Sequence, residues 1–174
     1  MEGLYTSSAS LKESESYETV RRAILNDKRS IGICSLSETN DHALMWAHYA
    51  DQYSGICIEY SLPQLLSNLP NGVDFVRMFY DEHGPTVPRS SKSPDVLAKM
   101  VLSYKNYRWL YEREWRMFAD HQGEVSYVKQ NCATHVYLGS RVKKPKKDKL
   151  EAALKSLEIL TTPMTIQRYS IKFD

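Results

Sequence analysis

The feature that most constrains the fold is the order in which short apolar segments and helical segments follow one another. Two apolar runs, SIGICSLS at residues 30–37 and GICIEY at residues 55–60, have the length and composition of buried strands. The segment NDHALMWAHYAD between them, residues 40–51, has the apolar spacing of a helix. Farther along, helices do not alternate regularly with strands, as the crossovers of a parallel sheet require. The sequence therefore predicts an α+β fold with a mixed, mostly antiparallel sheet and helices packed against it.

The remaining helices and strands are predicted from caps, apolar stripes and alternation. Ser93 as an N-cap, Pro94 at the first helical position and an apolar stripe from Val96 to Tyr104 predict the longest helix. Further helices are expected at residues 16–28, 63–68 and 146–158, and further strands at residues 73–80, 113–119, 124–128, 135–139 and 164–173.

Length and composition fit one globular domain. A chain of 174 residues that is 42% hydrophobic and 25% charged can bury a single core. Residues 1–15 are polar, so we expect an N-terminal arm followed by a single domain over residues 16–174. No apolar run has the length of a membrane span and no signal pattern is present, so we expect a cytoplasmic protein without a membrane partner. Three cysteines without metal-ligand spacing argue against a disulfide framework and against a metal site.

The first candidate site lies in the strand–helix–strand segment described above. His48 has the side chain of a general base at neutral pH, although a histidine on an apolar helix is also common as a hydrogen-bonded structural residue. Trp46 and Tyr49 are candidates to stack on a planar ligand, or they belong to the core. The turn before the second strand brings Ser35 and Ser37 near this helix, and both are ligand-binding candidates.

The second candidate site lies in YKNYRWLYEREWRMF, residues 104–118. If EREWRMF is a strand, Glu112, Glu114 and Arg116 project on one face, because side chains alternate along a strand. Two carboxylates beside an arginine can form a polar site in which one carboxylate is oriented and the other does chemistry. The alternative is an ion-pair ladder in which Arg116 satisfies Glu114.

The third candidate is a basic segment, RVKKPKKDK at residues 141–149, which holds six cations against one aspartate. Lysines of this kind contact phosphates in nucleic-acid-binding proteins. The alternative is a solvated loop around Pro145, and the net charge of +2 does not by itself imply a nucleic-acid partner. The nucleic-acid candidates are Lys143, Lys144, Lys146 and Lys147.

Taken together, these motifs resemble DUF2971, a bacterial family of unknown function. The family pattern has a Ser-rich strand, a Leu-Met-Trp-x-His-Tyr-Ala helix and a Gly-led apolar strand, followed by a Glu-x-Glu-Trp-Arg segment and an apolar strand that ends in Leu-Gly. The chain shows CSLSETNDHALMWAHYAD, GICIEY, WLYEREWRMF and HVYLGS in that order. The resemblance covers roughly residues 30–172.

DUF2971 is in turn distantly similar to ADP-ribosyltransferase-like domains of toxins and phage-defence proteins. Transferases of that class use a strand-borne glutamate to hold the ribose of NAD as nicotinamide leaves, and its charge favours the developing oxocarbenium ion. The resemblance implies NAD as a cofactor, Glu114 as the catalytic carboxylate and Glu112 as a contact to an RNA or protein acceptor. It also implies that Trp46 or Tyr49 stacks on the ligand.

Two function hypotheses follow. The first is an NAD-dependent ADP-ribosyltransferase-like enzyme, and the second is a non-catalytic relative that binds a protein or a nucleic acid. Family members usually open with a Tyr-Lys-Tyr-Arg-like strand and a strand that ends in Asn-Asp-Pro, whereas this chain has MEGLYTSSASLKESES before its first predicted helix. We therefore expect the residues that hold a dinucleotide to be missing or replaced. If there is one site, Glu114 and Arg116 should face a common cleft with the helix that carries Trp46 and Tyr49.

Overall fold

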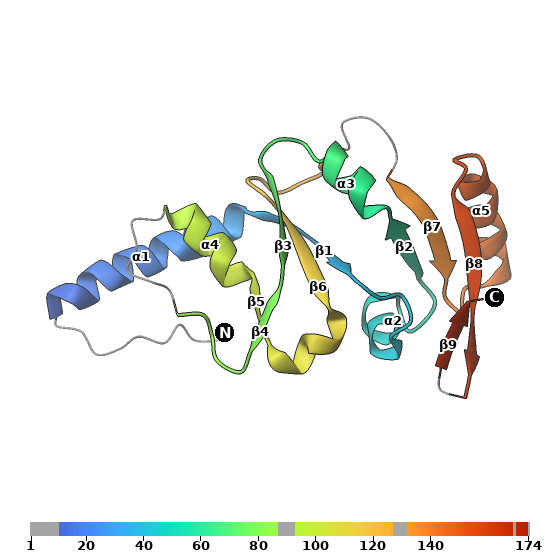
Figure 1. The fold of residues 1–174 in the computed structure, drawn as a ribbon, viewed down its shortest axis with the longest axis horizontal. Coiled ribbons are helices and arrows are strands. Elements are labelled where there is room, and N and C mark those ends of the chain that lie inside the picture. Colours follow the sequence, from blue (N-terminus) through green and yellow to red (C-terminus); the bar gives the residue numbers. More distant parts are fainter. Residues whose placement is uncertain (1–10, 87–92, 127–131, 169, 174) are drawn as a thin grey trace. The chain divides into compact units, whose positions relative to one another are not determined.

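The computed structural model describes residues 11–86, 93–126, 132–168 and 170–173, and these form two compact units (Figure 1). Unit 1 comprises Met1–Glu38 and Gly72–Glu124, and unit 2 comprises Thr39–Asn71 and Val125–Asp174. Both units contain helices and strands, and four of the six strand pairings in the described part are antiparallel. The predicted α+β fold with a mixed, mostly antiparallel sheet is confirmed.

Unit 1 is built on a three-stranded antiparallel sheet with the order β1-β6-β3. Two helices lie side by side against one face of this sheet, and their apolar residues pack on Phe118 of the central strand (Figure 1). A short parallel pair, β4 and β5, and a 3-10 helix, η1, complete the unit. The elements are α1 (Leu11–Ser30), β1 (Gly32–Ser37), β3 (Val73–Arg77), β4 (Phe79–Asp81), α4 (Pro94–Leu102), β5 (Tyr104–Asn106), η1 (Tyr107–Glu112) and β6 (Glu114–Ala119).

Three elements of unit 1 differ from the sequence-based prediction. Helix α1 begins at Leu11, before the predicted start at residue 16, so part of the predicted polar arm is helical. Residues 1–10 lie outside the described residues. The strand predicted over residues 73–80 is two strands, because the chain changes partner at the buried Met78. The amide of Met78 still bonds to β6, whereas that of the next residue bonds to the end of α4. Of the strand predicted at 124–128, the described residues 124–126 are not in a strand.

Unit 2 is built on a four-stranded sheet with the order β2-β7-β8-β9. Helix α2 covers one face through Trp46, together with its C-cap residue Ala50, and helix α5 covers the other through Leu150 and Leu154. The elements are α2 (Ala43–Tyr49), β2 (Ile56–Tyr60), α3 (Leu62–Asn68), β7 (Ala133–Leu138), α5 (Lys144–Lys155), β8 (Leu160–Gln167) and β9 (Ser170–Phe173). Among the residues described in either unit, no helix combines the length and the apolar character that crossing a bilayer requires.

Two features of unit 2 also differ from prediction. Helix α2 covers Ala43–Tyr49, a shorter span than the predicted residues 40–51, and Trp46 is its buried residue, while Leu44 is exposed. The strand predicted over residues 164–173 is a hairpin of β8 and β9, because the chain reverses near Arg168, which has a positive φ of 48°. A period-2 pattern continues through such a hairpin, so alternation alone does not reveal the turn.

Gly139, directly after β7, allows two backbone segments of unit 2 to approach closely. Its amide donates to Gly55 O at 3.0 Å, and a Cβ at this position would lie 2.1 Å from Tyr53 O. Because backbone atoms cannot move aside as a side-chain tip can, we expect Gly139→Ala to lower the free energy of unfolding by about 1–3 kcal/mol. Urea unfolding measures this, with Ser140→Ala at the next, exposed position as the control. A Gly139→Ala midpoint equal to that of the wild type would contradict the close approach.

Candidate functional site

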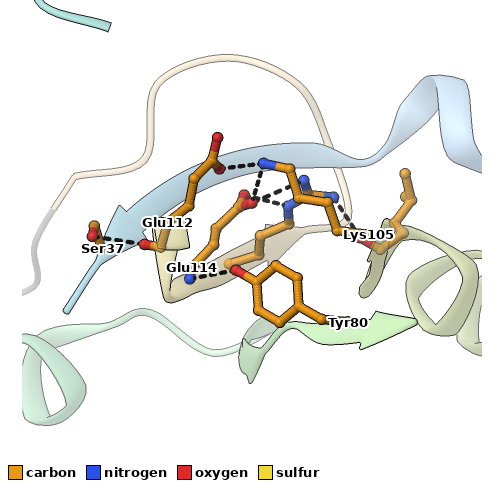
Figure 2. A network of polar contacts seen from close by, with 7 residues as sticks. Ser37, Tyr80, Lys105, Glu112 and Glu114 are labelled. Carbon is orange, nitrogen blue, oxygen red and sulfur yellow. Dashed lines mark hydrogen bonds and ion pairs between the residues drawn. The ribbon is translucent and has the colours of Figure 1, made fainter. Parts of the chain in front are cut away.

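Two glutamates and two cations meet in unit 1 (Figure 2). The Lys105 ammonium donates to Glu114 Oε2 at 2.9 Å and also contacts Glu112 Oε2. Arg116 Nε donates to Glu114 Oε1 at 2.7 Å, and its Nη2 donates to Oε2 at 3.3 Å. The Glu112 and Glu114 side chains are only 3% and 5% exposed. The four side chains therefore form a nearly buried ion-pair cluster, which we call the Glu–Lys cluster.

The elements of unit 1 explain how these side chains converge. Glu114 is the first residue of β6, and Arg116 lies two positions later, so both project to the same face of the sheet. Glu112 was expected on the same strand, but it is the last residue of η1, and Arg113 next to it has a left-handed backbone with φ 47° and ψ 48°. This bend, instead of strand alternation, brings Glu112 beside Glu114. Lys105 comes from β5.

Neutral groups hold the backbone around the cluster. Ser37 Oγ donates to Glu112 O at 2.7 Å, and the amide of Glu114 donates to the Tyr80 hydroxyl at 2.8 Å (Figure 2). Ser35 hydrogen-bonds to the Glu114 side chain. The serines predicted as ligand-binding residues therefore lie beside the predicted Glu-x-Glu pair, and both of them bond to it.

The contacts within the cluster favour the charged forms of Glu114 and Lys105. Burial alone would raise the pKa of Glu114, but hydrogen bonds from Arg116, Lys105 and Ser35 outweigh burial and lower this pKa below its ordinary value. Burial lowers the pKa of Lys105, and its contacts with Glu112 and Glu114 outweigh this and raise it. Glu114 is thus an ionised carboxylate whose two oxygens already accept hydrogen bonds. This arrangement is the ion-pair alternative considered for the motif, extended by Lys105.

Sequence reasoning missed Lys105 and Tyr80. Lys105 lies in a short strand that pairs in parallel with the strand of Tyr80, with Tyr80 and Lys105 as register partners. The parallel pairing of two three-residue strands leaves no periodic signal in the sequence. The lysine of YKN, residues 104–106, is visible in the sequence, but its presence does not indicate which side chains it contacts.

The other candidates of the first site belong to unit 2. Trp46 is only 3% exposed, packs against Phe173 and donates its Nε1 hydrogen to Asn40 O, so it is a core residue. His48 and Tyr49 are exposed, and their rings meet edge to face at 6.3 Å. The structure therefore brings together Ser35, Ser37, Glu112, Glu114 and Arg116, whereas Trp46, His48 and Tyr49 lie in the other unit. The common cleft stays a prediction.

Most of the predicted basic segment, from Lys144 on, is helical, so the helix begins two residues before its predicted start at residue 146. Lys143 is the N-cap of α5, and Lys144, Lys146 and Lys147 lie in its first turn, with Pro145 among the first helical residues. Proline at this position is typical of a helix start, because its missing N–H would have no partner there. The four lysines, called the lysine patch below, are therefore presented on a helix end.

A hydrogen-bonded carboxylate and phenol in unit 2 were not predicted as a pair. Tyr137 donates to Glu59 Oε2 at 2.6 Å, and the Tyr137 ring stacks on His135 with centroids 4.4 Å apart. His135 Nε2 lies 2.8 Å from Thr162 Oγ1. The antiparallel register of β2 and β7 places Glu59 opposite His135, and the sequence alone does not give this register.

This pair predicts a specific dependence of stability on pH. The hydrogen bond to Glu59 and burial raise the pKa of Tyr137 from 10.0 to about 12. Because the folded state holds this proton more tightly, the contribution is fully present below pH 10 and is lost as pH rises towards 12. We expect the stability difference between wild type and Tyr137→Phe to shrink over this range, measured by urea unfolding at each pH. Tyr107→Phe, at an exposed tyrosine, is the control, and a constant difference for Tyr137→Phe would contradict the shift.

Comparison with known proteins gives one family. No curated protein and no solved structure matches the chain. Residues 45–117 match a family described as "Protein of unknown function (DUF2971)", and the matched segment runs from α2 into β6. It contains the EREWR motif and all but the first residue of LMWAHYA. This match to residues 45–117 confirms the resemblance to DUF2971 that those motifs carry.

Proposed function

We propose that this chain is a non-catalytic binding protein that binds nucleic acid through the lysine patch on α5. One observation carries the proposal. Lys143, Lys144 and Lys146 are exposed, and among the residues that the structure describes, the only ion pair of the patch joins Lys147 to Glu151 at 3.7 Å. The cations of the patch are therefore available to phosphates.

Helix electrostatics supports this interpretation. The first turn of a helix carries a partial positive charge, so acidic residues are favoured there and lysines are disfavoured. The first turn of α5 contains no acidic residue, and its three patch lysines together with the N-cap Lys143 concentrate positive charge at the positive end of the helix. A bound anionic polymer such as a nucleic acid would be attracted both by the lysines and by the positive end of the helix. A surface hollow of about 410 Å³ adjoins the patch and is lined by Pro145, Lys146, Lys149 and Leu150.

The salt dependence of binding tests the proposal. We expect a labelled single-stranded RNA or duplex DNA to bind with an affinity that falls linearly on a log–log plot against salt, because binding releases counterions. Changing all four lysines of the patch to alanine should reduce this slope by up to about 3.6, since each phosphate contact contributes about 0.7–0.9. Fluorescence anisotropy at a series of salt concentrations measures both quantities.

A matched control is present in the same unit. Lys155 and Lys172 are exposed lysines outside the patch, and alanine at both should leave the slope near the wild-type value. The proposal fails if the wild type does not bind at low salt, or if the fourfold alanine variant keeps the wild-type slope.

The NAD-dependent ADP-ribosyltransferase is the second candidate, and one observation favours it. Glu112 and Glu114, the two glutamates of the Glu-x-Glu motif, come together on Lys105, and Glu114 is held ionised, as a carboxylate that favours a positive transition state must be. The fit to NAD is poor in one respect. Both Glu114 oxygens already accept hydrogen bonds, so a ribose hydroxyl would have to displace Lys105 or Arg116.

Calorimetric titration with NAD and an assay of nicotinamide release test this candidate. The assay is run with and without RNA and protein acceptors. Binding together with turnover would support the transferase. Absence of both in the wild-type chain would leave the nucleic-acid-binding proposal ahead.

A further inference from the structure

Glu38, directly after β1, gathers two arginines and an indole in unit 1. Its Oε1 lies 3.1 Å from Arg77 Nη2 and accepts a hydrogen bond from Trp115 Nε1 at 2.8 Å. Its Oε2 lies 3.1 Å from Arg113 Nε. The two guanidinium groups are thus held on the two oxygens of one carboxylate.

The sheet register places these groups on the face opposite the Glu–Lys cluster. Arg77 is the register partner of Trp115, and the amide of Glu38 donates to Arg113 O, which continues the β1–β6 pairing by one residue pair. Side chains alternate along β6, so Trp115 points away from the face that Glu114 occupies. The EREWR motif therefore supplies both faces: its glutamates and second arginine build the buried cluster, and its first arginine and tryptophan build this one.

The arginines are positioned, yet most of their donors remain available. The Arg77 and Arg113 side chains are 61% and 56% exposed, against 26% for Glu38. Each guanidinium has five N–H donors, and the contact to Glu38 involves one nitrogen of each arginine. Trp115 fixes the arrangement further, because its ring stacks on Phe75 at 5.0 Å and lies under the Arg77 guanidinium at 5.9 Å.

Two properties of this group suggest more than a surface ion pair. Two positive charges share one negative charge, so like charges are held close together with a net charge of +1. Arg113 also has a left-handed backbone, with φ 47°, which is unfavourable for a residue with a Cβ. A hydrogen bond from Trp115 lowers the pKa of Glu38, burial opposes this, and the two guanidiniums lower the pKa further, so Glu38 stays charged and keeps both arginines in place.

We infer that Arg77 and Arg113 form a binding site for a phosphoryl group, either free phosphate or a phosphate monoester. Arginine forks match phosphate oxygens in pairs, and a phosphoryl group offers three acceptor oxygens to the two forks, whereas a carboxylate offers two. The site is separate from the lysine patch, which lies in unit 2, and it does not depend on the proposed nucleic-acid binding.

The Trp115 indole reports on this site. The chain has three tryptophans, so its indole N–H signals can be resolved by NMR, and Trp115→Phe identifies the relevant one. At constant ionic strength, inorganic phosphate and methyl phosphate should each shift the Trp115 signal saturably, whereas acetate should not. A response to inorganic phosphate alone restricts the site to the free anion, and a response to both includes monoesters.

Variants test whether phosphate binds to these two arginines or is only attracted by the positive charge of the surface. Arg77→Gln and Arg113→Gln should each weaken binding by about tenfold or more, since each removes charged hydrogen bonds. Arg77→Lys keeps the charge but loses the fork, and should also weaken binding. Arg108→Gln, at an exposed arginine on η1, is the matched control and should bind like the wild type. The inference is overturned if phosphate gives no saturable shift, if acetate gives the same shift, or if the shift persists when both arginines are glutamine.

Discussion

Lys105→Met is expected to lower the free energy of unfolding by about 3–5 kcal/mol, which is the usual cost of removing one partner from a buried ion pair. The substitution keeps the apolar stem of the side chain and removes the ammonium. Glu112 and Glu114 would then lie close together, nearly buried, without the cation that both contact. Arg116 would still pair with Glu114 but does not replace the contact with Glu112. Urea unfolding of unit 1, followed by fluorescence, measures the loss.

The same unit offers a matched control for burial. Lys99 also bridges two carboxylates, with its Nζ 2.8 Å from Asp74 and 2.7 Å from Asp120, but those side chains are 58% and 68% exposed. Exposed pairs contribute about 0–1 kcal/mol because water and salt screen them. We therefore expect Lys99→Met to cost much less than Lys105→Met. Equal costs would mean that burial does not set the strength of the Glu–Lys cluster.

A combined variant tests the electrostatic cause. If the cost of Lys105→Met arises from carboxylates left near each other, adding Glu112→Gln should restore part of the lost stability. The reason is that a neutral amide removes one of the two buried negative charges. No recovery in the double variant would point to lost packing of the lysine stem instead.

The sequence could predict only those contacts of the Glu–Lys cluster that follow from the alternation of side chains along one strand. Glu114 and Arg116 lie on one strand, and alternation correctly placed them on one face. Glu112 was expected beside them for the wrong reason, because a 3-10 helix and the left-handed Arg113 bring it there. Lys105 comes from another strand through a parallel pairing, and no local pattern encodes which strands pair.

The same limit applies in unit 2. Apolar spacing correctly predicted a helix around Trp46, but it did not distinguish a core tryptophan from a ligand-stacking one, because both fit one helical face. The helix was expected to begin at residue 146, whereas α5 begins at Lys144, because Pro145 is tolerated among the first helical residues. The α+β class was predictable because it depends on the order of elements and not on their partners.

Glu114→Gln distinguishes the two candidate functions, because they assign different roles to the same charge. Glutamine keeps the shape and much of the hydrogen bonding but leaves Lys105 and Arg116 without the carboxylate that they share. A transferase that depends on this charge should lose about a hundredfold or more in the rate of nicotinamide release while the protein stays folded. The binding-protein proposal instead predicts a loss of stability of about 1–3 kcal/mol, from charged groups left unsatisfied. It also predicts no change in nucleic-acid affinity, because the lysine patch lies in unit 2.

Measuring stability, nicotinamide release and nucleic-acid binding on the same variant separates these outcomes. Glu112→Gln is the natural control, since in the transferase interpretation Glu112 contacts the acceptor and its loss should affect acceptor modification more than nicotinamide release. A stability loss with unchanged RNA binding and no turnover in either protein supports a structural Glu–Lys cluster in a binding protein. Turnover that survives Glu114→Gln would instead mean an enzyme whose catalytic residue lies elsewhere. His48, which is exposed and beside Tyr49, would then be the next residue to substitute.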